Sequence, residues 1–103
     1  MVEKVFNLSR GDENAVEKVV FDENVHYLHM VFNQGRGLPE HNSNSNVYMT
    51  VVRGVLSIGL DEQQVREYPA GTLLKIPHNT KMNVKNLHPQ TLELIVVKAP
   101  APG

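Results

Sequence analysis

Hydrophobic and polar residues alternate with a period of two along most of the chain, which indicates β-strands rather than helices. In the segment 25–32 (VHYLHMVF), one face carries His26, Leu28, Met30 and Phe32, and the other carries the residues between them. Similar short runs, many of them rich in β-branched residues, follow at 47–52, 55–60, 64–68, 72–77, 81–86 and 91–98. The run 47–52 (VYMTVV) predicts a strand that is buried on both faces.

Turn-forming residues separate these runs at short intervals, which is typical of a β-sandwich or β-barrel. The segment 11–20 (GDENAVEKVV) is the one weak helix candidate, but its second half reads equally well as a strand. We favour the strand, paired with 25–32 across the turn at 22–24. About ten short strands could close into a jelly roll, and the interior of such a small barrel can hold one small ligand.

Composition narrows the class of protein. The chain of 103 residues suits one domain, and its formal charge of -1 gives no electrostatic reason to expect a nucleic acid or an anionic membrane as partner. The absence of cysteine excludes disulfides, thiolate zinc sites and cysteine nucleophiles. No stretch resembles a signal peptide or a membrane span, so we expect a cytoplasmic protein.

Two sets of residues lie at regular spacings among the predicted strands. The first set comprises Gly35, His41 and Gly54. The second set comprises Gly71, Pro77 and Asn86. In this order and at these spacings, the regions 35–54 and 71–86 resemble the two motifs of the cupin family of small jelly-roll barrels. The resemblance implies an all-β, cupin-type jelly-roll β-barrel that occupies residues 1–103 as a single domain.

The chain departs from the family pattern at the positions that carry the chemistry. Metal-binding members resemble one another in using three histidines and a glutamate, and the matching positions here are His41, Ser43, Val47 and Met82. Val47 has no lone pair, a neutral serine is a poor ligand, and a thioether suits copper(I) better than a hard divalent ion. We therefore predict no metal and no cofactor. A rebuilt metal site that combines His41 with His26 or His78 is the alternative.

The alternation also predicts a cavity wall. If Val47 takes the inward position of the glutamate, Met49 points inward beside it. An apolar cavity with a few polar groups is typical of a small-molecule site, and a methionine adapts to irregular ligands. The predicted ligand-binding residues are therefore His41, Ser43, Val47, Met49 and Met82.

Three functions remain open from the sequence. The first is binding of a small organic molecule without a standard cupin metal site. The second is a metal-dependent dioxygenase or isomerase with rebuilt ligands. The third is a metal-free isomerase or epimerase with His41 as general base, for which the candidate partners are Glu40, Glu93, Tyr27 and Tyr48. Whether the protein is an enzyme stays open.

We also expect a homodimer, since dimers are the commonest soluble assembly. Small cupins resemble one another in pairing this way. The candidate interface comprises Met30, Phe32 and a first strand at residues 2–8 (VEKVFNL).

Overall fold

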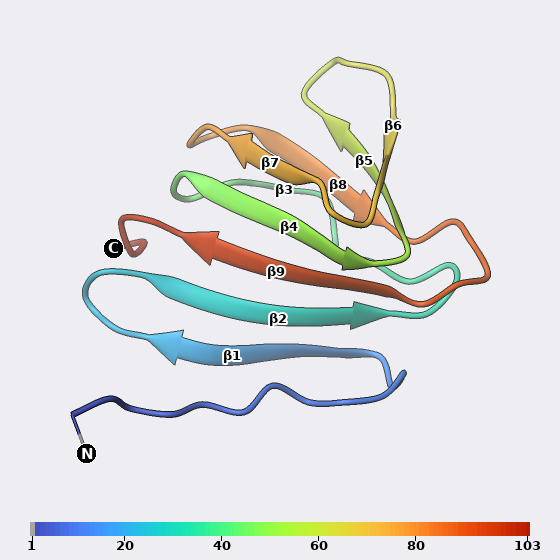
Figure 1. Ribbon diagram of the computed structural model, residues 1–103. Coiled ribbons are helices and arrows are strands. Elements are labelled where there is room, and N and C mark those ends of the chain that lie inside the picture. Colours follow the sequence, from blue (N-terminus) through green and yellow to red (C-terminus); the bar gives the residue numbers. More distant parts are fainter. Residues whose placement is uncertain (1) are drawn as a thin grey trace.

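Residues 2–103 are described by a computed structural model, and they form nine β-strands and no helix (Figure 1). The strands are β1 (Ala15–Phe21), β2 (His26–Phe32), β3 (His41–Asn42), β4 (Val47–Arg53), β5 (Val55–Leu60), β6 (Arg66–Pro69), β7 (Leu73–Ile76), β8 (Lys81–Lys85) and β9 (Leu92–Lys98). Within these residues there is accordingly no helix long and apolar enough to cross a bilayer.

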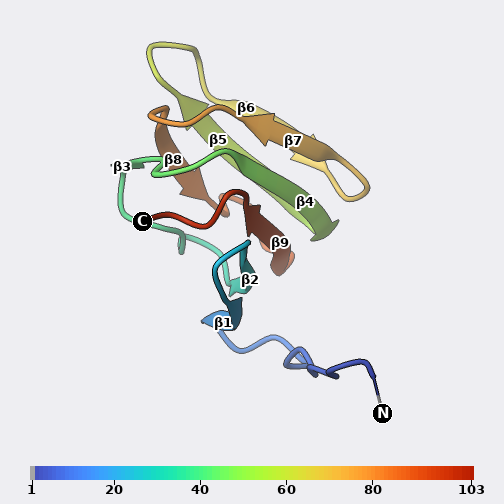
Figure 2. The ribbon, with the colours of Figure 1, turned by 90° about the vertical axis from the view of Figure 1, so that its left-hand side faces the viewer.

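The strands make two antiparallel sheets that face each other. One sheet has five strands in the order β1-β2-β9-β4-β7, and the other has four in the order β3-β8-β5-β6. Figure 2 shows the two sheets from the side, with the N-terminal segment leading away from the barrel. One core cluster takes its side chains from both sheets. The predicted all-β jelly-roll barrel is confirmed.

Of the two strands predicted in the N-terminal region, one forms and the other does not. The segment 15–21 is the strand β1, and it pairs antiparallel with β2 as expected, so the helix alternative is wrong. The expected strand at 2–8 does not form. No hydrogen bond between two backbone groups joins the segment 2–14 to the barrel. The bonds that hold this segment involve a side chain, for example the one from the backbone N–H of Ser9 to the carboxylate of Glu17.

Strands β4 and β9 of the five-stranded sheet bury mainly one face, whereas β2 is buried on both faces from Leu28 to Phe32. In β4, Val47, Met49 and Val51 are buried, whereas Val52 is 44% exposed. The expectation that 47–52 is buried on both faces is therefore wrong, because the outer face of this sheet meets solvent. Met30 and Phe32 lie in the barrel core with 4% and 1% of their surface exposed. They are covered within one copy of the chain and cannot form a dimer interface.

Residues at the motif positions shape the connections between strands. Gly54, between β4 and β5, has φ 83°, and a Cβ there would lie 2.4 Å from the carbonyl oxygen of Thr91. Asn79 has φ 64° in the turn between β7 and β8, where the family motif has a glycine. Asn86 is fully buried, and its amide nitrogen donates to the carbonyl oxygens of Phe32 and Gln90. These residues set the backbone path between the two sheets.

Candidate functional site

An apolar cavity of about 280 Å³ lies between the inner faces of the two sheets. Strands β1, β2, β4 and β9 form one side of it, and β3, β8 and the connection from β2 to β3 form the other. The lining residues are Val16, Leu28, Met30, Leu38, Pro39, His41, Met49, Met82, Val96 and Lys98. All of them are apolar except two basic residues, so the cavity can exclude water from an apolar ligand and still offer it a polar anchor.

His41 and Met82 lie side by side on one wall of this cavity. They are direct partners in the register of β3 and β8. His41 Nδ1 lies 2.8 Å from the carbonyl oxygen of Pro39, to which an Nδ1–H group donates a hydrogen bond. In the neutral ring that bond assigns the lone pair to Nε2, which has no hydrogen-bond partner among residues 2–103. The spacing of the two motifs thus brings together one histidine and one thioether.

Three of the five predicted ligand-binding residues line the cavity: His41, Met49 and Met82. Ser43 and Val47 do not line it. Ser43 Oγ donates to the carbonyl oxygen of Pro77 at 2.7 Å and accepts the backbone N–H of Thr80 at 2.8 Å. These bonds tie the end of β3 to the β7–β8 turn. Val47 is a fully buried core residue.

The four positions that hold a metal in metal-binding cupins do not fit an ion here. Ser43 already uses its hydroxyl as donor and acceptor within the turn, and Val47 has no donor atom. Among residues 2–103 no three His, Cys, Asp or Glu side chains are grouped so that they could hold a metal ion. The histidines considered for a rebuilt site lie elsewhere: His26 stacks on the ring of Phe21, and His78 lines a different hollow.

The candidate partners for His41 as a base also lie away from it. Glu93 is bound to His29 and Arg53 on the outer face of the five-stranded sheet. Tyr27 lines an outer hollow, and the ring of Tyr48 lies under Lys75. Glu40 is exposed and lines a separate polar hollow. Among residues 2–103, therefore, the His41 ring is oriented by the carbonyl oxygen of Pro39 and by no carboxylate.

Lys98 is a cavity residue that the sequence analysis missed. It is the last residue of β9 and pairs with His26 on one side and with Val47 on the other. Directly paired residues in an antiparallel sheet share a face, so Lys98 shares the inner face with the buried Val47. Burial lowers the pKa of the Lys98 ammonium group. The period-two pattern contained a signal, since Lys98 follows Leu92, Leu94 and Val96 at alternate positions.

A second missed residue is His29, on the opposite face of the same sheet. Its ring is fully buried between two carboxylates, with Nδ1 2.5 Å from Glu17 and Nε2 2.6 Å from Glu93. Burial by itself would lower the pKa of His29, but the hydrogen bonds to Glu17 and Glu93 outweigh it and raise the pKa. Both ring nitrogens therefore face an acceptor, and only the protonated ring, the imidazolium, can donate from both of them. Arg53 continues the chain of charges to Glu93 and Asp12.

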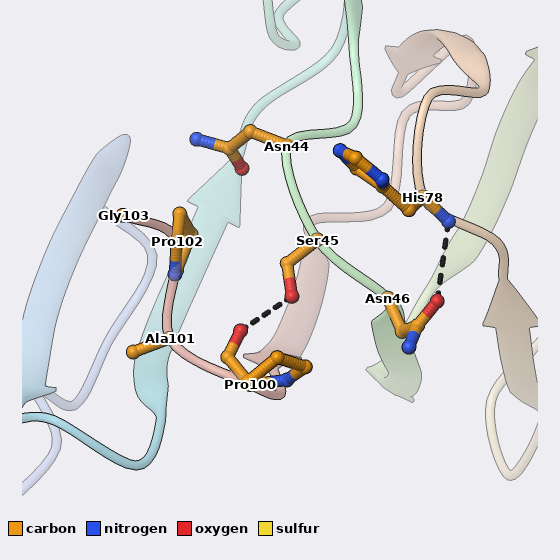
Figure 3. Close-up of a pocket in the computed structure, with 8 residues that line it drawn as sticks. All are labelled: Asn44, Ser45, Asn46, His78, Pro100, Ala101, Pro102 and Gly103. Carbon is orange, nitrogen blue, oxygen red and sulfur yellow. Dashed lines mark hydrogen bonds between the residues drawn. The ribbon is translucent and has the colours of Figure 1, made fainter.

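A polar hollow of about 360 Å³ lies at the end of the barrel beside the C-terminal segment (Figure 3). Figure 3 shows two hydrogen bonds within it: Ser45 donates to the carbonyl oxygen of Pro100, and the Asn46 side-chain oxygen accepts the backbone N–H of His78. The backbone N–H of Ala101 donates to the carbonyl oxygen of Asn24. These hydrogen bonds fasten the C-terminal segment 99–103 to the barrel.

The two facing sheets and the motif-positioned cavity define the class: a small double-stranded β-helix, or cupin, barrel. No protein-family model matches the chain. The chain is 37% identical over 103 residues to the uncharacterized protein MJ0764 of Methanocaldococcus jannaschii, with 99% of this chain and 89% of the relative aligned. The crystal structure of that relative, described as an RmlC-like cupin family protein with a double-stranded β-helix fold, superposes with a TM-score of 0.96 over 99% of this chain and 94% of the other.

Two more distant structures share the fold. A cupin superfamily protein of Desulfitobacterium hafniense has a TM-score of 0.76 at 12% identity and covers 90% of this chain and 83% of its own. A cupin-like protein of Thermotoga maritima has a TM-score of 0.71 at 19% identity and covers 76% of this chain and 59% of its own. The chain belongs to the RmlC-like cupin family, as the motif spacing predicted.

Proposed function

We propose that this protein binds a small organic molecule in the apolar cavity and does so without the standard cupin set of metal ligands. The observation that carries the proposal is the cavity itself, about 280 Å³ in volume with eight apolar and two basic lining residues. Small-molecule sites are concave, mostly apolar and equipped with few polar groups. An apolar cavity of about 150 Å³ already suffices to bind benzene, so the volume is large enough for a compact ligand.

The larger hollow at the barrel end supports binding less well. The Ser45 hydroxyl already binds the C-terminal segment, and the Asn46 amide oxygen already binds the β7–β8 turn. A ligand there would have to replace those hydrogen bonds, whereas a ligand in the apolar cavity would bury carbon surface without breaking any. The transfer of apolar surface from water then favours the cavity by about 25 cal/mol per Å².

Cavity binding can be tested by NMR. A panel of small apolar scaffolds is titrated into ¹⁵N-labelled protein, and chemical-shift changes are followed at cavity backbone amides such as those of His41, Met82 and Lys98. Leu38→Trp should block binding, since Leu38 is half-buried on the cavity wall. Leu73→Trp is the matched control, because Leu73 is 62% exposed on β7.

We expect saturable shifts at the cavity residues in the parent protein and in Leu73→Trp, and none in folded Leu38→Trp. If no scaffold shifts the cavity amides, or if Leu38→Trp binds as well as the parent, then the proposal is wrong. A fold control by far-UV circular dichroism accompanies each variant.

A further inference from the structure

Lys98 places an ammonium group in a cavity whose other lining residues, apart from His41, are apolar. In the sheet register Lys98 is paired with His26 on β2 and with Val47 on β4. The next inward-facing residue of β9 is Val96, which is paired with Leu28 and Met49. These three apolar side chains form the wall next to Lys98, and the cavity contacts all of them. A ligand lying along the wall therefore meets an ammonium group at one end.

The described part of the chain, residues 2–103, supplies no counter-charge for this ammonium group. Among residues 2–103, Lys98 makes no ion pair with a carboxylate, and its Nζ has no hydrogen-bond acceptor. Lys98 is half-buried and its Nζ is still reached by solvent, so the charge is tolerated in the free protein. A ligand that displaces this solvent must supply an acceptor in its place, because an unpaired charge that is fully desolvated is costly. Lys81 on β8, for comparison, pairs with Glu62, and Lys18 lies over the ring of Phe21.

The surroundings of Lys98 favour an anion over a cation. The second polar residue of the cavity is His41, which is also a base, and the cavity lining contains no acid. His26 pairs with Lys98 in the strand register, but its ring stacks on Phe21 and does not line the cavity. Asp22, in the β1–β2 turn close to His26, uses its Oδ1 to accept the backbone N–H groups of Asn24 and Val25.

We infer that the ligand of this cavity is an organic carboxylate, with its carboxyl group paired to Lys98 and its carbon skeleton against Leu28, Met49 and Val96; this inference rests on the proposed function. A carboxylate needs one cation and few further donors. A phosphate carries up to two charges and is usually held by several donors or an arginine fork, which this cavity does not contain among its lining residues.

The inference is tested with matched pairs of ligands that differ only in charge. Benzoate is compared with benzamide, and hexanoate with hexanamide, by NMR titration of the parent protein, Lys98→Met, Lys98→Arg and the control Lys85→Met. Lys85 is exposed on β8 and does not line the cavity. Hydrogen bonds to charged groups are worth about 1.5–3 kcal/mol, so we expect the parent to prefer each carboxylate over its amide by about 10- to 100-fold.

We expect this preference to fall below about threefold in Lys98→Met, to persist in Lys98→Arg and to be unchanged in Lys85→Met. Equal binding of carboxylate and amide by the parent would overturn the inference and leave the proposed function standing. A carboxylate preference that survives in Lys98→Met would also overturn it, by assigning the anion to another group. If neither form of either scaffold binds, the proposed function itself fails. The parent comparison needs no variant, so a Lys98→Met protein that does not fold still leaves a decisive result.

Discussion

The buried His29 predicts that the stability of the protein depends on pH in a specific direction. The ring holds edge strand β1 to β2 and β9 through Glu17 and Glu93, and the pKa of His29 is raised in the folded state. A group with a raised folded pKa contributes stability that is fully present below the unfolded value, about 6.5. That contribution is lost as the pH rises through the folded pKa. Stability should therefore decline on the alkaline side of neutrality.

The magnitude follows from linkage. Between the unfolded and the folded pKa of one group, the free energy of unfolding changes by at most about 1.4 kcal/mol per pH unit. On the acid side Glu17 acts in the opposite sense, because its hydrogen bond to His29 lowers its pKa. The Glu17 contribution is present above the unfolded value, about 4.3, and is lost as the pH falls further. The network as a whole should thus be most stabilising between about pH 5 and 6.

His29→Gln is the informative variant. It keeps a polar side chain of similar size and removes the charge, and at pH 6 it should lower the free energy of unfolding by about 1–3 kcal/mol. The lower end is favoured because Glu17 and Glu93 keep 31% and 21% of their side-chain surface exposed and can be rehydrated. The matched control is His88→Gln, since the His88–Glu67 pair lies on the surface and should matter little.

Urea unfolding from pH 4 to pH 9, at one protein concentration, measures both effects. We expect the parent and His88→Gln to lose stability above pH 6.5 and His29→Gln to lose much less, so that the curves converge at high pH. Parallel curves for the parent and His29→Gln above pH 6.5 would refute the reasoning, because His29 would then have no raised pKa. A constant protein concentration excludes a contribution from self-association.

Two further predictions concern residues of the motifs. Gly54→Ala should lower the free energy of unfolding by more than about 2 kcal/mol, because alanine is strained at φ 83° and its Cβ would contact the Thr91 carbonyl oxygen; an unchanged urea midpoint would contradict this. Ser43→Ala should cost about 1–3 kcal/mol through its two lost hydrogen bonds and leave the affinity for a cavity ligand within about twofold. A loss of affinity without a loss of stability would instead return Ser43 to the binding site.

Several strands could be predicted from the sequence because one of their faces is buried. In β4, β8 and β9 the alternate residues are buried, so the period of two is visible in the letters. In β2 the last five residues are buried on both faces, and the alternation there reflects which sheet face each side chain takes rather than its exposure. The segment 2–8 shows the limit of this argument. Its apolar residues Val2, Val5 and Phe6 are all more than half exposed, so their spacing does not reflect a pairing in this chain. The predicted dimer could cover them, and that prediction stays open.

The side chains of the site were harder to predict than its position. His29 and Lys98 both interrupt apolar strand patterns, yet acids from two neighbouring strands pair with His29, whereas Lys98 has no acidic partner among residues 2–103. The difference depends on register. Glu17 stands directly opposite His29, and Glu93 lies diagonally to it, opposite Val31, whereas His26 and Val47 flank Lys98. Register between strands that are distant in the chain cannot be read from periodicity alone.

The motif spacing predicts the path of the backbone better than it predicts the functional side chains. The reason is that the two kinds of position are under different physical constraints. Gly54 and Asn79 adopt positive φ, and few residues do so without strain, so the choice of residue there is narrow. Position 82 needs only an inward side chain that fills the space opposite His41, and a methionine meets that need as well as a histidine. The barrel can therefore keep its shape while its metal ligands change. The group that takes over ligand binding from the metal has to be identified in the folded cavity, as a charged side chain without a partner. Among the lining residues of this cavity, that side chain is Lys98.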